Sequence, residues 1–314
     1  MTVTVDQFLT RLKARVTLPA NNELLSTDRL LEIGDDVVRD KMVSLMMSVN
    51  QNYFVTSENE TLVSSQDAYC IPYRSIGRTL RDLKLVQNDS NSSTSDMSLV
   101  ALEDEHLFAR DGVPRFFFFQ GDRIMVRPTP NTTDFYLKKF YDLQPSRMVT
   151  GSEAALVASI TDNVVTVTGS MPSEITTGVL VDFIQGKQGC RTLGMDATTT
   201  NVSATQITFA SSDDIPSDLV AGDYVSLFQT TPVVQFPDEA VPLIITLSAV
   251  RVMHAIGDFE AQDKLEQDAA RQEVALLKMI APRIEGENTK IVNRRGLLRG
   301  QGFNSWRSRF GSSL

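Results

Sequence analysis

Apolar residues recur at helical spacing in three stretches of the chain. In residues 6–16 they return every three or four positions. A longer pattern covers residues 26–54 and opens with a Ser-Thr-Asp sequence, which is typical of a helix N-cap. The third covers residues 238–282, with Asp238 as the predicted cap and a predicted break at Gly257. The pattern therefore predicts helices near both ends of the chain.

The two long patterns differ in what they bury. We expect the methionines of residues 42–47 to pack in a core rather than to form an adaptable binding stripe. The first half of residues 238–282 is apolar enough for a central helix, whereas its second half is rich in Asp and Glu. That second half is predicted to be a solvated helix.

Between these helices, the pattern changes to the alternation of β-strands. Residues 60–63 and 68–73 are short strand candidates, and the polar residues 86–96 read as a loop. Residues 115–130 predict a hairpin that turns at Gln120-Gly121-Asp122, with residues 134–143 as a third strand beside it.

Four successive phenylalanines, residues 116–119, lie in that hairpin. Alternation places two rings on each face of the strand, so both faces must be covered. A core covers one face, and the other meets either a neighbouring element of the chain or a second subunit.

Residues 150–231 have a different composition. Lys and Arg almost vanish, and short runs of Thr, Val and Ser alternate with turn residues. This predicts a small antiparallel barrel or sandwich. The few basic residues, Lys187 and Arg191 among them, argue against a nucleic-acid-binding barrel, which would need a cationic groove.

Together these patterns predict an α+β chain: a helical bundle with an antiparallel β hairpin region, an inserted small β-barrel or sandwich, and an extended C-terminal tail. The predicted parts are residues 1–149 for the first part of the body, 150–231 for the insertion, 232–287 for the helices that complete the body, and 288–314 for a basic tail.

The residues that usually carry catalysis or bind metals are scarce. Cys70 and Cys190 are the only cysteines, and both are expected to be small buried hydrophobic residues. His106 is predicted in a solvated turn, and His254 in a helix core. The sequence has neither a phosphate-binding loop nor a dinucleotide-binding glycine motif. We therefore expect no enzymatic activity, no cofactor and no metal.

The N-terminus lacks the pattern of a signal peptide, and no stretch is long and apolar enough to span a membrane. The expectation is a protein made in a cytoplasm, without a membrane partner.

Charge separates the tail from the rest of the chain. Residues 288–314 contain six Lys and Arg and no Asp or Glu, and because the whole chain carries −9, residues 1–287 carry −15. The tail has no helical period, but it spaces apolar and basic side chains that a partner groove could bind. A nucleic-acid-binding arm and a tail without a role are the alternatives. The candidate docking residues are Arg294, Arg295, Leu297, Leu298, Arg299, Phe303, Trp306, Arg307, Arg309 and Phe310.

Three more arginines, Arg74, Arg78 and Arg81, have spacings of four and three. This spacing predicts one helical face, whose side chains pair with carboxylates of the same subunit or of a neighbour. We assign them to a subunit interface. Replacing all three with Glu is expected to spare folding and to prevent assembly of the subunits.

The order of motifs resembles the head-to-tail adaptor, or connector, proteins of tailed bacteriophages. The resemblance rests on the helical stretch "DDVVRDKMVSLMMSVNQNYFVTS", the segments "YCIPYRSIGRTLRDL", "FFFFQGDRIMVRP" and "FYLKKFYDLQPSRMV", the later "GDYVSL" and "PVVQFPDEAVPLI", and the tail "APRIEGENTKIVNRRGLLRG". The insertion at residues 150–231 departs from compact adaptors.

This resemblance implies a structural protein of the virion neck, between capsid and tail. Such proteins form a ring of twelve copies beneath the portal, send the C-terminal segment into the portal, offer the other face to tail or nozzle proteins, and let DNA pass without reading its sequence. The alternative is a receptor- or carbohydrate-binding virion protein that uses the β insertion and is mounted by the helices.

Overall fold

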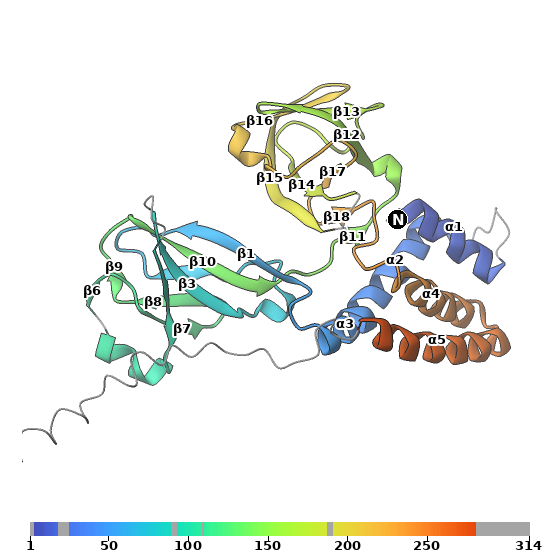
Figure 1. Ribbon diagram of the computed structural model, residues 1–314, viewed down its shortest axis with the longest axis horizontal. Helices are drawn as coiled ribbons and strands as arrows, with labels where there is room; N and C mark the ends of the chain where they lie inside the picture. The colour runs from blue at the N-terminus through green and yellow to red at the C-terminus, as the bar shows by residue number, and fades with distance from the viewer. Residues whose placement is uncertain (1–2, 18–24, 89–92, 109, 187–190, 281–314) are drawn as a thin grey trace, which may run out of the picture. The chain divides into compact units, whose positions relative to one another are not determined.

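The computed structural model describes residues 3–17, 25–88, 93–108, 110–186 and 191–280. Their buried apolar side chains form three main clusters: one among the helices, one between two β-sheets and one inside a closed barrel. The chain is α+β, as predicted, and the parts that hold these cores are called the helical part, the sandwich and the barrel (Figure 1).

The helical part joins both ends of the described chain. α1 (Val5–Val16), α2 (Thr27–Val37), the π-helical turn η1 (Val38–Met42) and α3 (Val43–Val49) share a core with α4 (Val241–Ile256) and α5 (Phe259–Ile280). The hydroxyl of Ser26 accepts a hydrogen bond from the Arg29 amide, which confirms the predicted cap of α2. Met42 and Met46 lie in the core, as expected.

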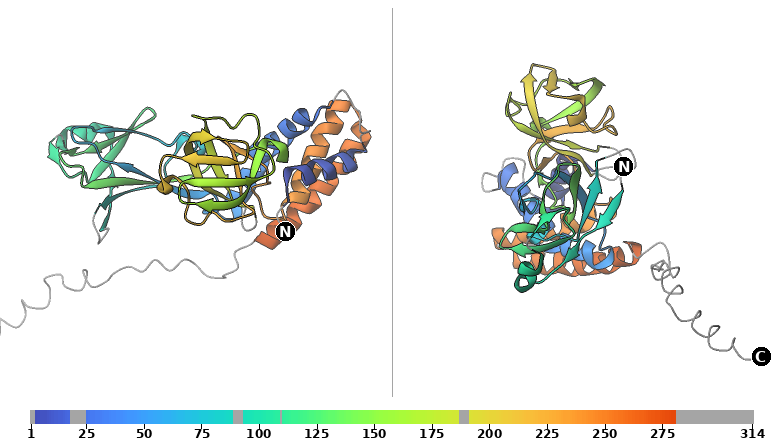
Figure 2. Two further views of the ribbon diagram at one scale, coloured as in Figure 1. Left: turned by 90° about the horizontal axis from the view of Figure 1, so that it is seen from above. Right: turned by 90° about the vertical axis from the view of Figure 1, so that its left-hand side faces the viewer.

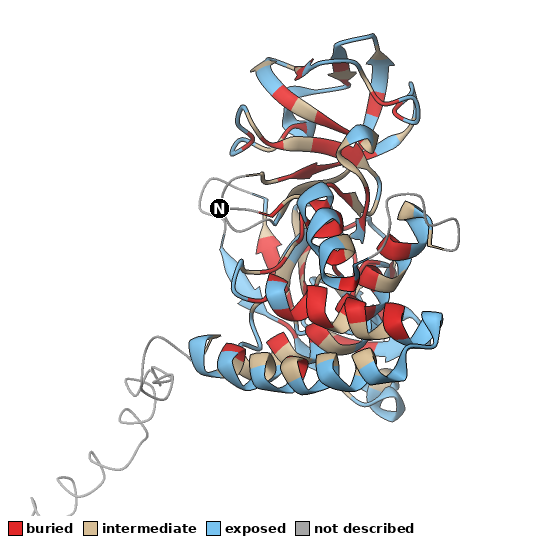
Figure 3. Cartoon of the chain, turned by 90° about the vertical axis from the view of Figure 1, so that its right-hand side faces the viewer, coloured by how far each residue is buried: buried red, intermediate tan, exposed pale blue. Residues whose placement is uncertain are grey.

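The break between α4 and α5 is confirmed. Gly257 has φ 87°, a left-handed conformation that glycine adopts without a Cβ clash, and it ends α4. The predicted cap at Asp238 is wrong. α4 begins at Val241, and its N-cap residue Ala240 makes no side-chain hydrogen bond; Pro242 lies in the first turn, where a missing N–H is tolerated. In Figure 3, α4 is mostly buried, whereas α5 is largely exposed, as its acidic sequence predicted.

The sandwich packs two four-stranded sheets face to face, in the orders β1-β10-β3-β4 and β2-β8-β7-β5. Strands β6 and β9 form a separate pair, and the turns η2 and η3 lie between strands. The elements are β1 (Val55–Thr61), β2 (Ala68–Cys70), η2 (Ile76–Arg78), β3 (Asp82–Gln87), β4 (Thr94–Asp96), β5 (Ser98–Leu99), η3 (Leu102–Phe108), β6 (Asp111–Gly112), β7 (Phe116–Gln120), β8 (Arg123–Arg127), β9 (Thr129–Pro130) and β10 (Phe135–Asp142).

Two strand predictions need correction. The hairpin of β7 and β8 is confirmed, but β10 does not pair with it; β10 lies in the other sheet, between β1 and β3. The segment predicted as a loop over residues 86–96 contains the short strand β4, which pairs with β3. Local sequence could not decide either point, because strand pairing depends on contacts between distant residues.

Phe116, Phe117 and Phe118 are covered on the two faces that the alternation predicts. Phe117 lies in the core between the sheets. On the opposite face Phe118 is buried, and the ring of Phe116 packs on Phe108 of η3 with their centroids 4.2 Å apart. A neighbouring element of the same chain therefore covers the second face, and Phe119 remains 38% exposed.

The predicted β insertion is a closed antiparallel barrel with the strand order β12-β13-β16-β15-β14-β17. Its strands wrap around one core in both views of Figure 2. The turns η4 and η5 accompany it, and the elements are η4 (Gly151–Glu153), β12 (Ala154–Thr161), β13 (Val164–Thr168), β14 (Leu180–Ile184), β15 (Thr192–Val202), β16 (Gln206–Phe209), η5 (Ser212–Asp214) and β17 (Tyr224–Leu227).

The segments that enter and leave the barrel run side by side as a parallel pair, β11 (Arg147–Met148) and β18 (Thr230–Thr231). Both are anchored to the helical part. The Met148 amide donates to Asp35 Oδ1 on α2 (2.9 Å). The Val5 amide at the start of α1 donates to the carbonyl of Pro232 (2.9 Å).

Candidate functional site

The segment that carries Arg74, Arg78 and Arg81 is not a helix. A three-residue turn, η2, replaces it, with left-handed φ values of 63° at Gly77 and 52° at Arg78. These two residues turn the chain into β3, whose pairing with β10 fixes an extended backbone from Asp82 onward. The predicted common helical face is therefore wrong.

Each of the three arginines nevertheless pairs with a carboxylate of its own chain, one of the two possibilities expected. The shortest N–O distances are 2.7 Å for Arg74 to Asp196, 3.3 Å for Arg78 to Asp122 and 2.7 Å for Arg81 to Asp142. Arg74 is only 4% exposed, so it does not present a surface to a neighbouring copy. A subunit contact at Arg78 or Arg81 stays a prediction.

Arg74 is the centre of a contact between the sandwich and the barrel. Its two terminal nitrogens donate to the two oxygens of Asp182 on β14, both at 2.8 Å, and one also reaches Asp196 on β15 at 2.7 Å. The Tyr73 hydroxyl donates to Asp196 (2.5 Å), and the guanidinium lies 5.1 Å from the ring centroid of Phe228. A planar guanidinium that donates two hydrogen bonds to one carboxylate fixes the relative orientation of the two side chains as well as their distance.

The charges of this cluster depend on one another. Burial raises the pKa of Asp182, and the hydrogen bonds and charge of Arg74 act against that rise. Burial disfavours the charged form of Arg74, but hydrogen bonding to Asp182 outweighs it and raises the pKa above its ordinary value. Burial and the hydrogen bond to Asp196 raise the pKa of Tyr73 to about 12, so its hydroxyl is a neutral donor. The cluster is an ion pair that holds two parts of the chain together.

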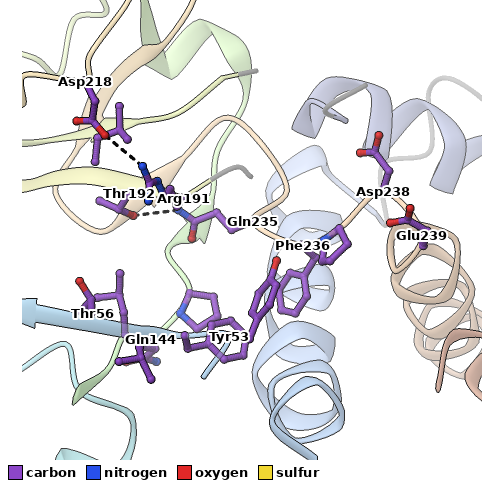
Figure 4. Close-up of a pocket in the computed structure, with 16 residues that line it drawn as sticks. Tyr53, Thr56, Gln144, Arg191, Thr192, Asp218, Gln235, Phe236, Asp238 and Glu239 are labelled. Carbon is purple, nitrogen blue, oxygen red and sulfur yellow. Dashed lines mark hydrogen bonds and ion pairs between the residues drawn. The ribbon is translucent and has the colours of Figure 1, made fainter. Parts of the chain in front are cut away.

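A cleft of about 770 Å³ lies where the helical part, the sandwich and the barrel meet (Figure 4). Each of the three chain crossings between these parts lines it: residues 53–56 from α3 to β1, residues 143–145 from β10 to β11, and residues 235–239 from β18 to α4. The barrel adds residues 191–193 and 218. A partner in this cleft would contact every connection between the three parts.

The walls of the cleft combine aromatic and polar groups. Tyr53, Phe54 and Phe236 form one aromatic group with centroid separations of 4.9 to 6.5 Å. Gln235 accepts from the Ser146 amide (2.9 Å) and donates to Thr192 Oγ1 (3.1 Å), which ties two crossings to the barrel.

The charged groups of the cleft are mainly acidic. Arg191 pairs with Asp218 at 3.2 Å, and both are exposed. The carboxylates of Asp238 and Glu239 also line the cleft (Figure 4). Among the described residues of the lining, one guanidinium and three carboxylates sum to a net charge near −2.

Several predicted residues have other surroundings than expected. Cys70 is exposed rather than buried. His254 is exposed on α4, where it contacts Gln262 (3.2 Å), so the predicted core histidine is wrong. His106 lies in the exposed turn η3, as predicted. Cys190 and the tail residues from Arg294 to Phe310 lie outside the described residues.

The cleft was missed at the level of sequence. Its residues come from five separate segments of the chain, so only the pairing of distant strands brings them together. The connecting segments between predicted elements were the one feature of the sequence that could have indicated a binding site.

No protein-family model matches the chain, and no curated protein matches it either. Within the described ranges, His, Cys, Asp and Glu do not gather into a group of three or more that could hold a metal ion. Among the same residues, none of the helices is long and apolar enough to cross a membrane.

Proposed function

We propose that this chain is a head-to-tail adaptor of a tailed bacteriophage, a structural protein of the virion neck. Copies of it form a ring, of twelve if it follows the proteins that its motifs resemble, between the portal and the tail or nozzle proteins. DNA passes through the ring, and the chain performs no reaction of its own.

The observation that carries this proposal is the division of the chain into two unlike units. The described residues up to 280 hold the three cores of the first unit, and the division between the units falls after residue 281. The basic sequence from residue 288 onward falls entirely in the second unit, while residues 1–287 carry −15. A folded acidic body with a separate basic segment suits a protein that binds one partner through the segment and others through its body.

The contacts inside the first unit support the role of a mount. Helices from the beginning and the end of the described chain share one core, which is the arrangement we propose for an adaptor body. The barrel is anchored at its base through β11 and β18 and at its side through Arg74. The acidic body also suits a DNA channel, because like charge keeps phosphates from binding its wall.

Deletion of Asn293–Leu314 tests the proposal. The shortened chain is expected to keep its fold, because all three described cores lie before residue 281, and to lose binding to the portal. The measurement is a pull-down of purified portal by full-length and shortened protein, with circular dichroism to verify folding. Equal recovery of portal by the two proteins would refute the docking role of the tail.

A further inference from the structure

The cleft opens onto the edge of a β-sheet. β1 is the edge strand of the order β1-β10-β3-β4, and its first two residues, Val55 and Thr56, line the cleft. An edge strand offers backbone N–H and C=O groups to another extended chain. A segment that entered the cleft could therefore continue along β1 as an added strand.

Charge complementarity indicates what kind of segment fits. The described residues of the cleft lining include three carboxylates and the guanidinium of Arg191, which is paired with Asp218. The adjoining strand has the sequence "VTSENET", in which Glu58 is exposed and Glu60 pairs with Lys139 of β10. A segment in the cleft meets the acidic side chains of the lining, and along β1 it meets Glu58, so basic side chains are favoured and acidic ones are repelled.

The aromatic group gives the cleft a second means of recognition. Phe54 and Phe236 are buried, whereas the ring of Tyr53 is partly exposed beside them. A tyrosine face attracts guanidinium and ammonium groups, and its edge packs against apolar side chains. Alternating basic and apolar residues would place one kind of side chain toward the aromatic group and the other toward the carboxylate rim.

We propose that the cleft and the edge of β1 bind an extended, basic segment of a partner protein as an added strand. This inference builds on the proposed function, because it supplies the second docking surface that an adaptor needs besides its C-terminal segment. The partner is defined by its chemistry: arginine or lysine alternating with apolar residues, in a stretch that is not folded before it binds.

The test uses the full-length chain and a fluorescein-labelled peptide of alternating arginine and valine, followed by fluorescence polarisation. A peptide of alternating glutamate and valine is the matched probe. The basic peptide is expected to bind about tenfold more tightly or better, and to protect the amides of β1 from hydrogen exchange. Absence of a preference, or of protection in β1, would overturn the proposal.

Two variants test whether the basic peptide binds in the cleft. Glu239→Lys changes an exposed cleft residue and is expected to weaken binding of the basic peptide about fivefold to tenfold. Glu103→Lys makes the same change on the exposed turn η3, outside the cleft, and is expected to alter binding less than twofold. Equal weakening in both variants would mean attraction to the whole acidic body and would contradict a site in the cleft.

A second copy of the chain is the other candidate occupant, because residues 288–314 are basic as well. Light scattering of the Glu239→Lys variant and the parent chain distinguishes the two. A change of mass caused by the variant would assign the cleft to a contact between copies and overturn our choice of a partner protein. The binding measurement requires no portal, so its failure can be told from failure of the tail to bind the portal.

Discussion

At the scale of single residues, Asp35 combines burial with incomplete pairing. It lies on α2 and is 7% exposed. Its Oδ1 accepts from the Met148 amide, whereas its Oδ2 is buried without a hydrogen-bond partner among the described residues, with Arg147 Nε at 3.7 Å. Burial raises the pKa of Asp35 from 3.8 to about 6, and the Met148 amide, Arg39 and Arg147 act against this rise.

This pKa predicts how stability depends on pH. Because the pKa is raised in the folded chain, the stabilising contribution of Asp35 is complete below pH 3.8 and is lost as the pH rises through about 6. Asp35→Asn keeps an acceptor for the Met148 amide and does not ionise. Relative to the parent chain, its free energy of unfolding should gain about 2 kcal/mol between pH 4 and pH 8.

Urea unfolding at several pH values measures the difference. Asp36→Asn is the control, because Asp36 is the exposed neighbour on the same helix. A constant difference between Asp35→Asn and the parent chain over this pH range would show that Asp35 does not titrate differently in the folded and unfolded states.

At the scale of elements, Arg74 links the segment before η2 to strands β14 and β15. Its removal leaves Asp182, which is fully buried, without its main counter-charge. This burial argues against the expectation that Glu can replace all three arginines without loss of folding, because a carboxylate at position 74 would face Asp182 in the interior.

Arg74→Met should lower the free energy of unfolding by about 3 to 5 kcal/mol, because it leaves the buried carboxylate of Asp182 without its counter-charge. Arg78→Met, at a pair whose side chains are 59% and 66% exposed, should cost less than about 1 kcal/mol. The double variant Arg74→Met/Asp182→Asn should recover part of the loss, since it removes the unpaired charge. Chemical denaturation of the three variants provides the comparison, and similar losses at positions 74 and 78 would argue against the interior ion pair.

At the scale of the whole molecule, net charge bears on assembly. Residues 1–287 carry −15, so neighbouring bodies repel one another at moderate salt. A closed ring joins different surfaces of identical chains, and a portal that gathers many tails raises the local concentration of bodies. Weak lateral contacts then suffice to close the ring.

We therefore expect the free chain to be largely monomeric and to assemble on the portal. Static light scattering of the purified protein at micromolar concentration measures its mass, and addition of portal supplies the positive control. A stable free ring would mean that lateral contacts suffice without the portal, and it would reduce the C-terminal segment to an anchor.

The sequence alone predicted the features that depend on neighbouring residues. Helical spacing located α1 and the helices on both sides of Gly257, and the alternation of Thr and Val located the barrel. Both patterns arise because one face of an element is buried, which leaves a period in the sequence. The row of phenylalanines likewise required cover on two faces, and η3 supplies one of them.

Tertiary structure decided which distant segments meet. It placed β10 in the opposite sheet, turned the arginine segment at Gly77, and brought Arg74 to carboxylates 108 and 122 positions away. It also assembled the cleft from three chain crossings and the barrel. Side-chain spacing cannot predict such contacts, because pairing between distant strands and burial of charge depend on the complete packing of the chain rather than on any local period.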